Sequence, residues 1–405
     1  MKPILRAERM KPVHSDIRGP LFVEAMKRQK QGIDVLKLNT GNPATFGFGL
    51  PDSIKNALME HMQDGVGYCD FKGMPQARQA ICDYETSKGI TGITPDDVFI
   101  GNGVSEVVSF ALTPLLNDGD EVLVPSPSYS LWGNSVYLED GKPVFYTCDE
   151  KANWYPDIQD IRSKITDKTK AIVIINPNNP TGVLYPKELL LEIIQIARES
   201  GLLIFADEIY DRLVMDGKQH ISLASLTEDV PVITLNGLSK SHCLCGYRCG
   251  WMVISGPREL TEDYRQGIIQ LTSLRLCANT MAQIVIPAAL DDMETPASMV
   301  RPGGRIYEQR EATVRELEKI DGLSFVKNDA AFYVFPKLDV KKFNITNDKQ
   351  FAHDLLDATN ILLVPGSGFD WKDPDHFRIV MLPQADILSD AIRRMGTFLD
   401  GYKQK

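Results

Sequence analysis

The chain of 405 residues is predicted to adopt an α/β fold, with a large domain in which a mostly parallel sheet lies between helices. Short apolar runs recur through the middle of the chain with helical stretches between them, the order that a parallel sheet requires. Most of these runs are continuously apolar, which is typical of strands buried on both faces. The expected strands are residues 97–100, 121–124, 171–175, 202–206, 232–235 and 251–254.

The helix expected between the third and fourth runs has clear ends. Pro186 suits its first turn, leucines and isoleucines fill its body, and Gly201 stands where a left-handed cap belongs. A strand, a helix and a second strand in this order place both strands parallel in one sheet.

The sequence pattern changes towards both ends of the chain. There it predicts amphipathic helices and strands with alternating apolar and polar residues, such as residues 331–335 and 377–381. We therefore expect a smaller α+β domain built from both termini. Residues 1–45 are assigned to an N-terminal segment and part of that small domain, residues 46–295 to the large domain, and residues 296–405 to the small C-terminal domain.

Composition narrows the classes of function. A formal net charge of −10 without long basic runs disfavours nucleic acid and anionic membranes as partners. The N-terminus lacks the apolar core of a signal peptide, and no stretch of about eighteen uncharged apolar residues occurs, so a soluble cytoplasmic protein is expected. Seven cysteines without a Cys-x-x-Cys spacing do not suggest a disulfide framework. Cys243, Cys245 and Cys249 share one loop but lack a fourth ligand at a familiar spacing, so no metal is predicted.

Ligands of open α/β sheets bind beyond the carboxyl ends of the strands, so the residues that follow each run are candidate site residues. The first run is followed by residues 101–106 (GNGVSE), a glycine turn that opens a helix. The free amides of this turn, at Gly103, Val104 and Ser105, could hold a phosphate, although a purely structural turn has the same pattern.

Two polar turns follow the third and fourth runs. Residues 176–182 (NPNNPTG) place the amide of Asn179 at the sheet edge. Asp207 and Tyr210 follow the fourth run, so a carboxylate and a phenol are expected to face a common cavity. A helix N-cap is the structural alternative for Asp207.

The fifth run is followed by residues 236–241 (NGLSKS), which put Lys240 at a strand end rather than on a solvated helix. Lysines are usually surface residues, so this position is unusual. Arg248 follows in residues 246–250 (GYRCG) and supplies a cation that can bind phosphate through two parallel hydrogen bonds.

These motifs, occurring together and in this order, resemble the fold type I, pyridoxal-phosphate-dependent aminotransferases of class I and II over nearly the whole chain. The resemblance implies that Lys240 forms the Schiff base with the cofactor aldehyde and then carries the α-proton. It implies that Asp207 keeps the pyridine nitrogen protonated. Asn179 and Tyr210 would hydrogen-bond the ring oxygen and tune the Schiff-base pKa.

The same resemblance implies further contacts to the cofactor and a second subunit. Tyr129, in residues 125–129 (PSPSY), matches the aromatic residue that stacks on the ring. Tyr68, in residues 67–73 (GYCDFKG), matches a tyrosine that family members lend to the partner subunit's phosphate, which implies a homodimer with shared active sites. The phosphate itself would be held by Gly103, Val104, Ser105, Ser239 and Arg248.

Three positions are similar to the family's substrate contacts, and one of them is Asn179, in addition to its contact with the ring oxygen. Arg378, in residues 376–379 (HFRI), matches the small-domain arginine that binds the substrate α-carboxylate in a forked geometry. Gly41 would offer its backbone to the same carboxylate from a mobile N-terminal segment that closes over the ligand and excludes water.

A shorter resemblance predicts which amino acid the enzyme prefers. Residues 17–21 (IRGPL) and 38–43 (LNTGNP) look like the opening of alanine aminotransferases. This implies transfer between L-alanine and 2-oxoglutarate, giving pyruvate and L-glutamate, with Arg18 a candidate contact for the longer carboxylate.

Three alternatives stay open at this point. An aminotransferase of the same fold could act on aromatic or branched-chain amino acids. A carbon–sulfur β-lyase would share the lysine, the aspartate and the arginine. A non-enzymatic regulator with this fold usually carries an appended DNA-binding domain, and the residues before Gly41 are too few and not basic enough for one.

Overall fold

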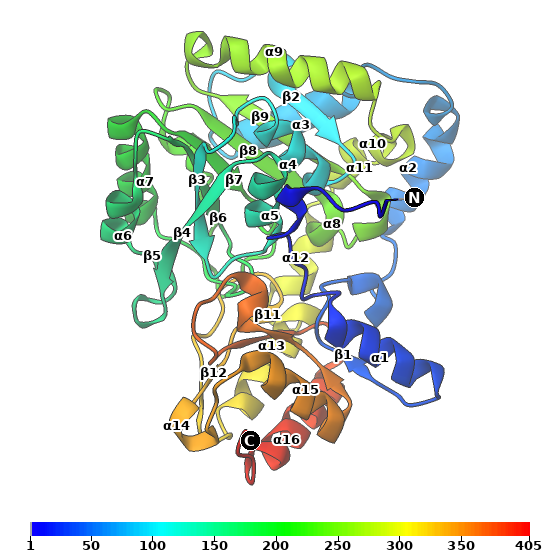
Figure 1. The fold of residues 1–405 in the computed structure, drawn as a ribbon. Coiled ribbons are helices and arrows are strands. Elements are labelled where there is room, and N and C mark those ends of the chain that lie inside the picture. Colours follow the sequence, from blue (N-terminus) through cyan, green and yellow to red (C-terminus); the bar gives the residue numbers. More distant parts are fainter. Residues whose placement is uncertain (1) are drawn as a thin grey trace.

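The computed structural model describes residues 2–405, which form a large sheet flanked by helices and a smaller region below it (Figure 1). The helices are α1 (Pro20–Lys30), α2 (Asp52–His61), α3 (Pro75–Ser87), α4 (Val104–Leu112), α5 (Leu131–Leu138), α6 (Ile158–Lys164), α7 (Lys187–Ser200), α8 (Leu238–Ser241), α9 (Arg258–Arg275), α10 (Thr280–Ile284), α11 (Ile286–Asp291), α12 (Glu294–Val300), α13 (Arg305–Leu317), α14 (Val340–Phe343), α15 (Asp348–Thr359) and α16 (Ala385–Leu399). The strands are β1 (Leu36–Lys37), β2 (Val98–Gly101), β3 (Glu121–Ser126), β4 (Lys142–Asp149), β5 (Tyr155–Pro156), β6 (Thr169–Ile175), β7 (Leu203–Asp207), β8 (Val232–Gly237), β9 (Gly250–Ser255), β10 (Leu323–Ser324), β11 (Tyr333–Val334), β12 (Lys337–Leu338), β13 (Ile361–Leu362), β14 (Val364–Pro365) and β15 (Phe377–Val380).

The large sheet has eight strands in the order β2-β9-β8-β7-β6-β3-β4-β5. Its central strands β8, β7, β6, β3 and β4 are parallel, whereas β9 runs antiparallel to both β8 and β2, and β5 runs antiparallel to β4. The mostly parallel sheet is therefore confirmed, and all the expected strands are present. The prediction missed β4, because Lys142, Thr147 and Asp149 interrupt its apolar character.

Alternate residues of β6 show why its run is continuously apolar. Ile172 and Ile174 pack in a core cluster with Ile193 of α7. Val173 belongs to a second cluster, which includes Ile268 of α9. Helices thus cover both faces of the sheet, so neither set of side chains meets water. The expected helix on one face is α7, which follows Pro186 and ends at Gly201 with a φ of 66°.

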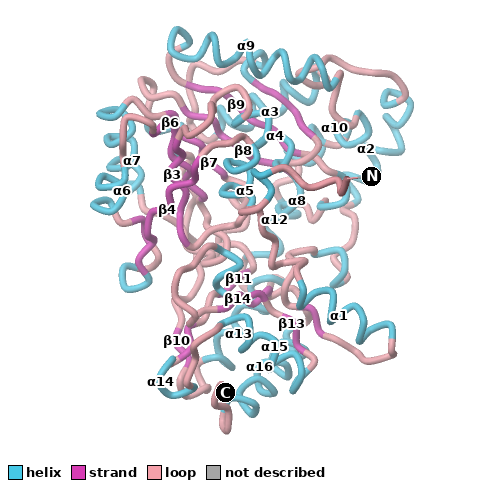
Figure 2. The backbone as a smooth tube through the Cα atoms, viewed as in Figure 1, coloured by secondary structure: helices cyan, strands magenta, loops and turns pink. Residues whose placement is uncertain are grey.

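Helix α1 and strand β1 from the N-terminal part of the chain lie beside the C-terminal elements in the smaller region (Figure 2). β1 pairs in parallel with β13, and Leu38 lies in one core cluster with Phe351 and Ile392. β15 pairs antiparallel with both β11 and β14. The N-terminal segment therefore depends on the C-terminal helices for its burial, while the boundaries at residues 45 and 295 stay predictions.

Within residues 2–405, no single helix is long and apolar enough to cross a membrane. The bent pair of α9 and residues 280–291, whose axes differ by 119°, meets the same criteria of length and composition. In the structure, Val285 and Ile286 of this pair are buried in a core cluster.

Candidate active site

Lys240 lies in α8, a single turn of helix that follows β8 directly. Its Nζ donates a hydrogen bond to the carbonyl oxygen of Gly41, at 3.0 Å. The thiol of Cys245 lies 4.0 Å from the same nitrogen, and the Phe332 ring centroid lies 5.9 Å away. The lysine therefore sits at a strand end among groups from three parts of the chain, one of which is the N-terminal segment.

Asp207 is the last residue of β7, and Leu235 of the neighbouring strand β8 lies beside it. Its Oδ2 accepts a hydrogen bond of 3.0 Å from the indole N–H of Trp132. Burial raises the pKa of Asp207 to about 6, although the Trp132 hydrogen bond acts in the opposite direction. A buried carboxylate that has few hydrogen-bond donors to offset its desolvation is well suited to bind a cation, such as a protonated ring nitrogen.

Tyr210 lies three residues beyond Asp207 and is buried. Its hydroxyl lies 2.8 Å from the hydroxyl of Tyr333, and the rings make an edge contact at 5.7 Å between centroids. Burial raises the pKa of Tyr210 well above its usual value. Tyr333 was missed by sequence reasoning, because a tyrosine in a short apolar strand looks like a core residue.

Arg378 of β15 is 1% exposed, and its guanidinium is held without any acidic partner among residues 2–405. Nη1 donates to Oδ1 of Asn179 at 3.0 Å, and Nη2 donates to the carbonyl oxygen of Asn39. The ring centroids of Tyr333 and Phe369 lie 4.5 and 4.7 Å from its central carbon. Nε is buried without a hydrogen-bond partner, and burial lowers the pKa of the guanidinium.

The glycine turn and Arg248 lie against each other in the structure. Gly103 precedes α4 with a φ of 84°, a conformation that favours glycine. A Cβ atom at this position would come within 2.7 Å of the central carbon of the Arg248 guanidinium. The Gly103 amide donates to the carbonyl oxygen of Gly101, but the amides of Val104 and Ser105, in the first turn of α4, have no partner within the helix. The exposed guanidinium therefore lies beside a helix N-terminus, an arrangement suited to an anion.

Four other predicted cofactor contacts make no side-chain hydrogen bond to Lys240. Ser239 is buried beside Lys240, and its carbonyl oxygen accepts from the Cys245 thiol at 2.9 Å. Tyr129 is partly buried in the loop between β3 and α5, while Val104 and Ser105 form the first turn of α4 and Ser105 is exposed. Within this one chain, the structure does not join these positions to Lys240 by side-chain hydrogen bonds.

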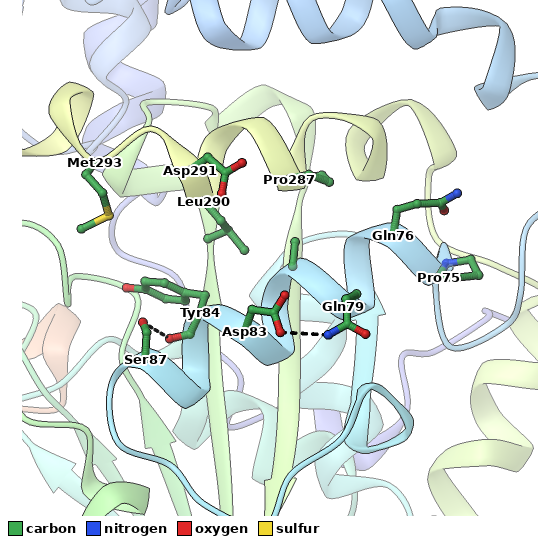
Figure 3. A pocket seen from close by; sticks show the side chains of 11 residues that line it. Pro75, Gln76, Gln79, Asp83, Tyr84, Ser87, Pro287, Leu290, Asp291 and Met293 are labelled. Carbon is green, nitrogen blue, oxygen red and sulfur yellow. Dashed lines mark hydrogen bonds between the residues drawn. The ribbon is translucent and has the colours of Figure 1, made fainter.

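Tyr68 and Arg18 stay apart from the other predicted residues. The Tyr68 side chain is 84% exposed in the loop before α3, and Arg18 lies in an exposed turn before α1. A separate cavity of about 760 Å³ lies between α3 and α11 (Figure 3) and contains none of the predicted residues.

Comparison with known proteins identifies the family. The sequence profile of the family described as Aminotransferase class I and II matches residues 33–392. The chain therefore belongs to the class I and II aminotransferases, whose members generally use pyridoxal phosphate, and its structure is that of fold type I. The α/β fold and the family resemblance are thus confirmed.

Individual relatives match over the full length. The glutamate-pyruvate aminotransferase AlaA of Haemophilus influenzae is 50% identical, with 100% of each chain covered. The crystal structure of an aminotransferase from Escherichia coli has a TM-score of 0.98 and 47% identity, again with 100% of each chain covered. The alanine aminotransferase from Pyrococcus furiosus has a TM-score of 0.93 and 41% identity, covering 98% of this chain and 100% of that chain.

Proposed function

We propose that the protein is a pyridoxal-phosphate-dependent alanine aminotransferase, which converts L-alanine and 2-oxoglutarate to pyruvate and L-glutamate. The observation that carries this proposal is Arg378, a buried guanidinium without an acidic partner among residues 2–405. A substrate α-carboxylate would supply the missing anion. The names of the full-length relatives from Haemophilus influenzae and Pyrococcus furiosus support alanine as the amino donor.

The residues at the strand ends fit the proposed cofactor. When bound, pyridoxal phosphate supplies a carbonyl carbon that receives the amino group and a ring that accepts electrons from the substrate Cα. Asp207 would hold the positive ring nitrogen, and because burial raises the pKa of its carboxyl group, a cation at this position would favour the ionised form. Gly103 and Arg248 would hold the phosphate, where a side chain on Gly103 would displace the guanidinium.

Proton transfer in this proposal belongs to Lys240. Its Nζ lies within hydrogen-bonding distance of Gly41, so the amine is positioned next to the N-terminal segment that would cover the substrate. The amine would act as the base that accepts the proton from the substrate Cα and would hold that proton at Nζ. Tyr210 and Asn179 would orient the ring oxygen, and Arg378 and Gly41 would fix the carboxylate so that the Cα–H bond faces Nζ.

A homodimer with shared sites is part of the proposal. Exposed apolar side chains gather on the segment before α3 and around the start of α10, where Thr280 Oγ1 donates to the carbonyl oxygen of Gly65 at 2.7 Å. Tyr68 belongs to this group. The exposed side chains are those of Met59, Met62, Val66, Tyr68, Leu274, Leu276 and Met281. An apolar patch of this kind is typical of a protein–protein interface, and a second copy would cover it.

Substrate preference is tested by measuring kcat/KM for alanine, tyrosine and valine, each with 2-oxoglutarate as acceptor. We expect the highest value for alanine, with one pyruvate formed per glutamate. A higher value for tyrosine or valine would replace alanine by the aromatic or branched-chain alternative. Ammonia and pyruvate released from cystathionine without an oxo-acid acceptor would instead identify a β-lyase.

The roles of Lys240 and Tyr68 are tested together by mixing two inactive or weakened variants. Lys240→Ala should transfer no amino groups, and borohydride should trap no cofactor on it. Tyr68→Phe should bind the phosphate more weakly. If Tyr68 acts across the interface, a mixed dimer of the two variants contains one fully native site and regains activity. Failure of mixed dimers to regain activity would contradict a shared site. The cytoplasmic location stays a prediction, which cell fractionation can test.

A further inference from the structure

A largely buried ammonium group lies against the turn that follows β7. Lys88 follows the last residue of α3, and its Nζ lies 2.6 Å from Glu85 Oε2, 2.9 Å from Glu208 Oε2 and 3.2 Å from Asp211 Oδ2. Glu85, Glu208 and Asp211 are all buried. One ammonium group therefore lies within ion-pair distance of three buried carboxylates. An unpaired charge in the protein interior would lower the stability of the fold.

Two of these carboxylates lie in the turn that follows β7. Glu208 and Asp211 flank Tyr210 in sequence, and Glu208 is the neighbour of Asp207. Lys88 thus ties both ends of the turn 208–211 to α3. Because Asp207 and Tyr210 are the proposed partners of the cofactor ring, the position of this turn determines the position of both.

The same network reaches the strand that carries Lys240. Asp211 Oδ2 also accepts from Tyr84 Oη at 2.6 Å and from Asn236 Nδ2 at 2.7 Å. Asn236 lies in β8, close to its end, and Lys240 follows in α8. The Tyr84 ring lines the cavity between α3 and α11 (Figure 3). Tyr84, Asp211 and Asn236 therefore connect that cavity to the strand that precedes Lys240.

Several more groups face this network from neighbouring elements. Glu208 Oε1 accepts from Ser222 Oγ at 2.9 Å and from the Leu223 amide at 3.0 Å. Glu85 Oε1 accepts from the indole N–H of Trp251 at 3.2 Å. The remaining charged or titratable groups are Arg212, which lies 4.2 Å from the Tyr84 ring, His220, whose Nε2 is 3.9 Å from Glu208, and His242, which is near Arg212 and Asp211.

Burial raises the pKa of Glu85 to about 7, and the nearby carboxylates of Glu208 and Asp211 act in the same direction against the Lys88 charge. Burial alone would raise the pKa of Asp211, but the charges of Lys88, His220 and Arg212 and the hydrogen bond from Tyr84 hold it below its usual value. Lys88 therefore keeps Asp211 ionised next to the site. Glu208, Asp211 and His220 lie close enough to hold a metal ion, but the ammonium of Lys88 already lies against both carboxylates and would repel a cation.

We propose that Lys88 is a positioning residue, whose largely buried ammonium fixes the turn 208–211 and thereby aligns Asp207 and Tyr210 on the cofactor ring. This proposal rests on the proposed function. Lys88 touches neither cofactor nor substrate and acts only through the two carboxylates and Asn236.

The test is Lys88→Met in the full-length enzyme, with cofactor affinity, kcat, KM for alanine and the pH midpoint of the bound cofactor's visible absorbance as readouts. We expect the cofactor Kd to rise and kcat to fall by roughly tenfold each, while KM for alanine changes by less than about twofold, because Arg378 is not part of the network. The midpoint should move up by about one pH unit, because uncompensated carboxylates stabilise a protonated chromophore.

Two further variants separate charge from position. Lys88→Met combined with Asp211→Asn restores the net charge of the network, so the pH midpoint should return toward that of the wild type while the cofactor Kd stays raised, since the tie to α3 is still missing. Lys164→Met is the matched control, because Lys164 is also a partly buried lysine that pairs with a carboxylate, Asp160, but lies in α6, outside the proposed cofactor contacts. It should leave the cofactor Kd and the midpoint unchanged.

The proposal is overturned if Lys88→Met lowers only the melting temperature and keeps the wild-type cofactor Kd, kcat and pH midpoint. If that variant does not fold, Glu208→Gln decides, because it removes one ion pair and keeps the acceptor for Leu223. It should raise the cofactor Kd severalfold and move the midpoint down, and unchanged values would overturn the proposal. A wild-type protein that binds no pyridoxal phosphate would contradict the proposed function instead.

Discussion

Arg310 and Arg378 are both fully buried arginines, yet their surroundings differ in one respect. Arg310 of α13 donates to both carboxylate oxygens of Asp216, at 2.7 and 2.6 Å, and lies 2.9 Å from Glu311. Arg378 has the same kind of aromatic neighbour but contacts only an amide and a backbone oxygen. The charge of Arg310 is therefore balanced within the fold, whereas the charge of Arg378 remains to be balanced by a ligand.

The largest effect is expected from Arg378→Lys. An ammonium cannot form two parallel hydrogen bonds to a carboxylate, so kcat/KM for alanine should fall by about 100- to 1000-fold, or about 3–4 kcal/mol. Steady-state rates measure this loss. Arg310→Lys is the control and should change kcat/KM by less than about threefold in the folded enzyme. Comparable losses in both variants would remove the distinction between the two arginines.

Asp207 is the anionic counterpart of Arg378, and its raised pKa predicts a pH effect. A carboxyl group whose pKa is about 6 in the folded protein and 3.8 in the reference state binds its proton more tightly when folded. Its contribution to stability is therefore present below pH ~4 and is lost as the pH rises through ~6, about 3 kcal/mol in all. Urea unfolding of cofactor-free protein should show this loss relative to Asp207→Asn. Bound pyridoxal phosphate should reduce it, and an identical pH profile for the two proteins would contradict the assignment.

Stability should respond to the two arginines in the opposite order to activity. Arg310→Met leaves Asp216 without its partner and should lower the free energy of unfolding by about 2–3 kcal/mol, because Asp216 is partly exposed. Arg378→Met removes an unbalanced charge and should cost less than about 1 kcal/mol in the cofactor-free protein. Urea midpoints compare the two. A larger loss for Arg378→Met would show that its charge is already balanced in the fold.

The smallest effect concerns Arg248, a third arginine, which is exposed and rests against Gly103. Gly103→Ala would push the guanidinium away and strain a backbone with a φ of 84°. We expect the cofactor Kd to rise roughly tenfold, or about 1.4 kcal/mol, with KM for alanine nearly unchanged. Gly201→Ala, at another positive φ but with open space around it, controls for backbone strain alone. If Gly103→Ala and Gly201→Ala had the same cofactor Kd, the turn at Gly103 would have no role in phosphate binding.

The predicted strands and strand-end residues were accessible from the sequence because burial on both sheet faces forces continuous apolar runs. The polar residues that interrupt this pattern, such as Asn179, Asp207 and Lys240, then stand out at the ends of the strands. Tyr333 could not be distinguished in this way, since an apolar neighbourhood hides a functional phenol. Lys88 looks like a solvated lysine three residues after Glu85, and only the fold brings Glu208 and Asp211 to it.

The backbone of residues 39–41 accepts from two groups that the proposed reaction would engage. Asn39 receives a hydrogen bond from Arg378 and Gly41 receives one from Lys240. A ligand that binds the Arg378 guanidinium or the Lys240 amine would remove one of these hydrogen bonds from residues 39–41. Amide hydrogen exchange and protease cleavage between β1 and α2 should therefore rise with ligand occupancy, which offers a binding assay that needs neither turnover nor a chromophore.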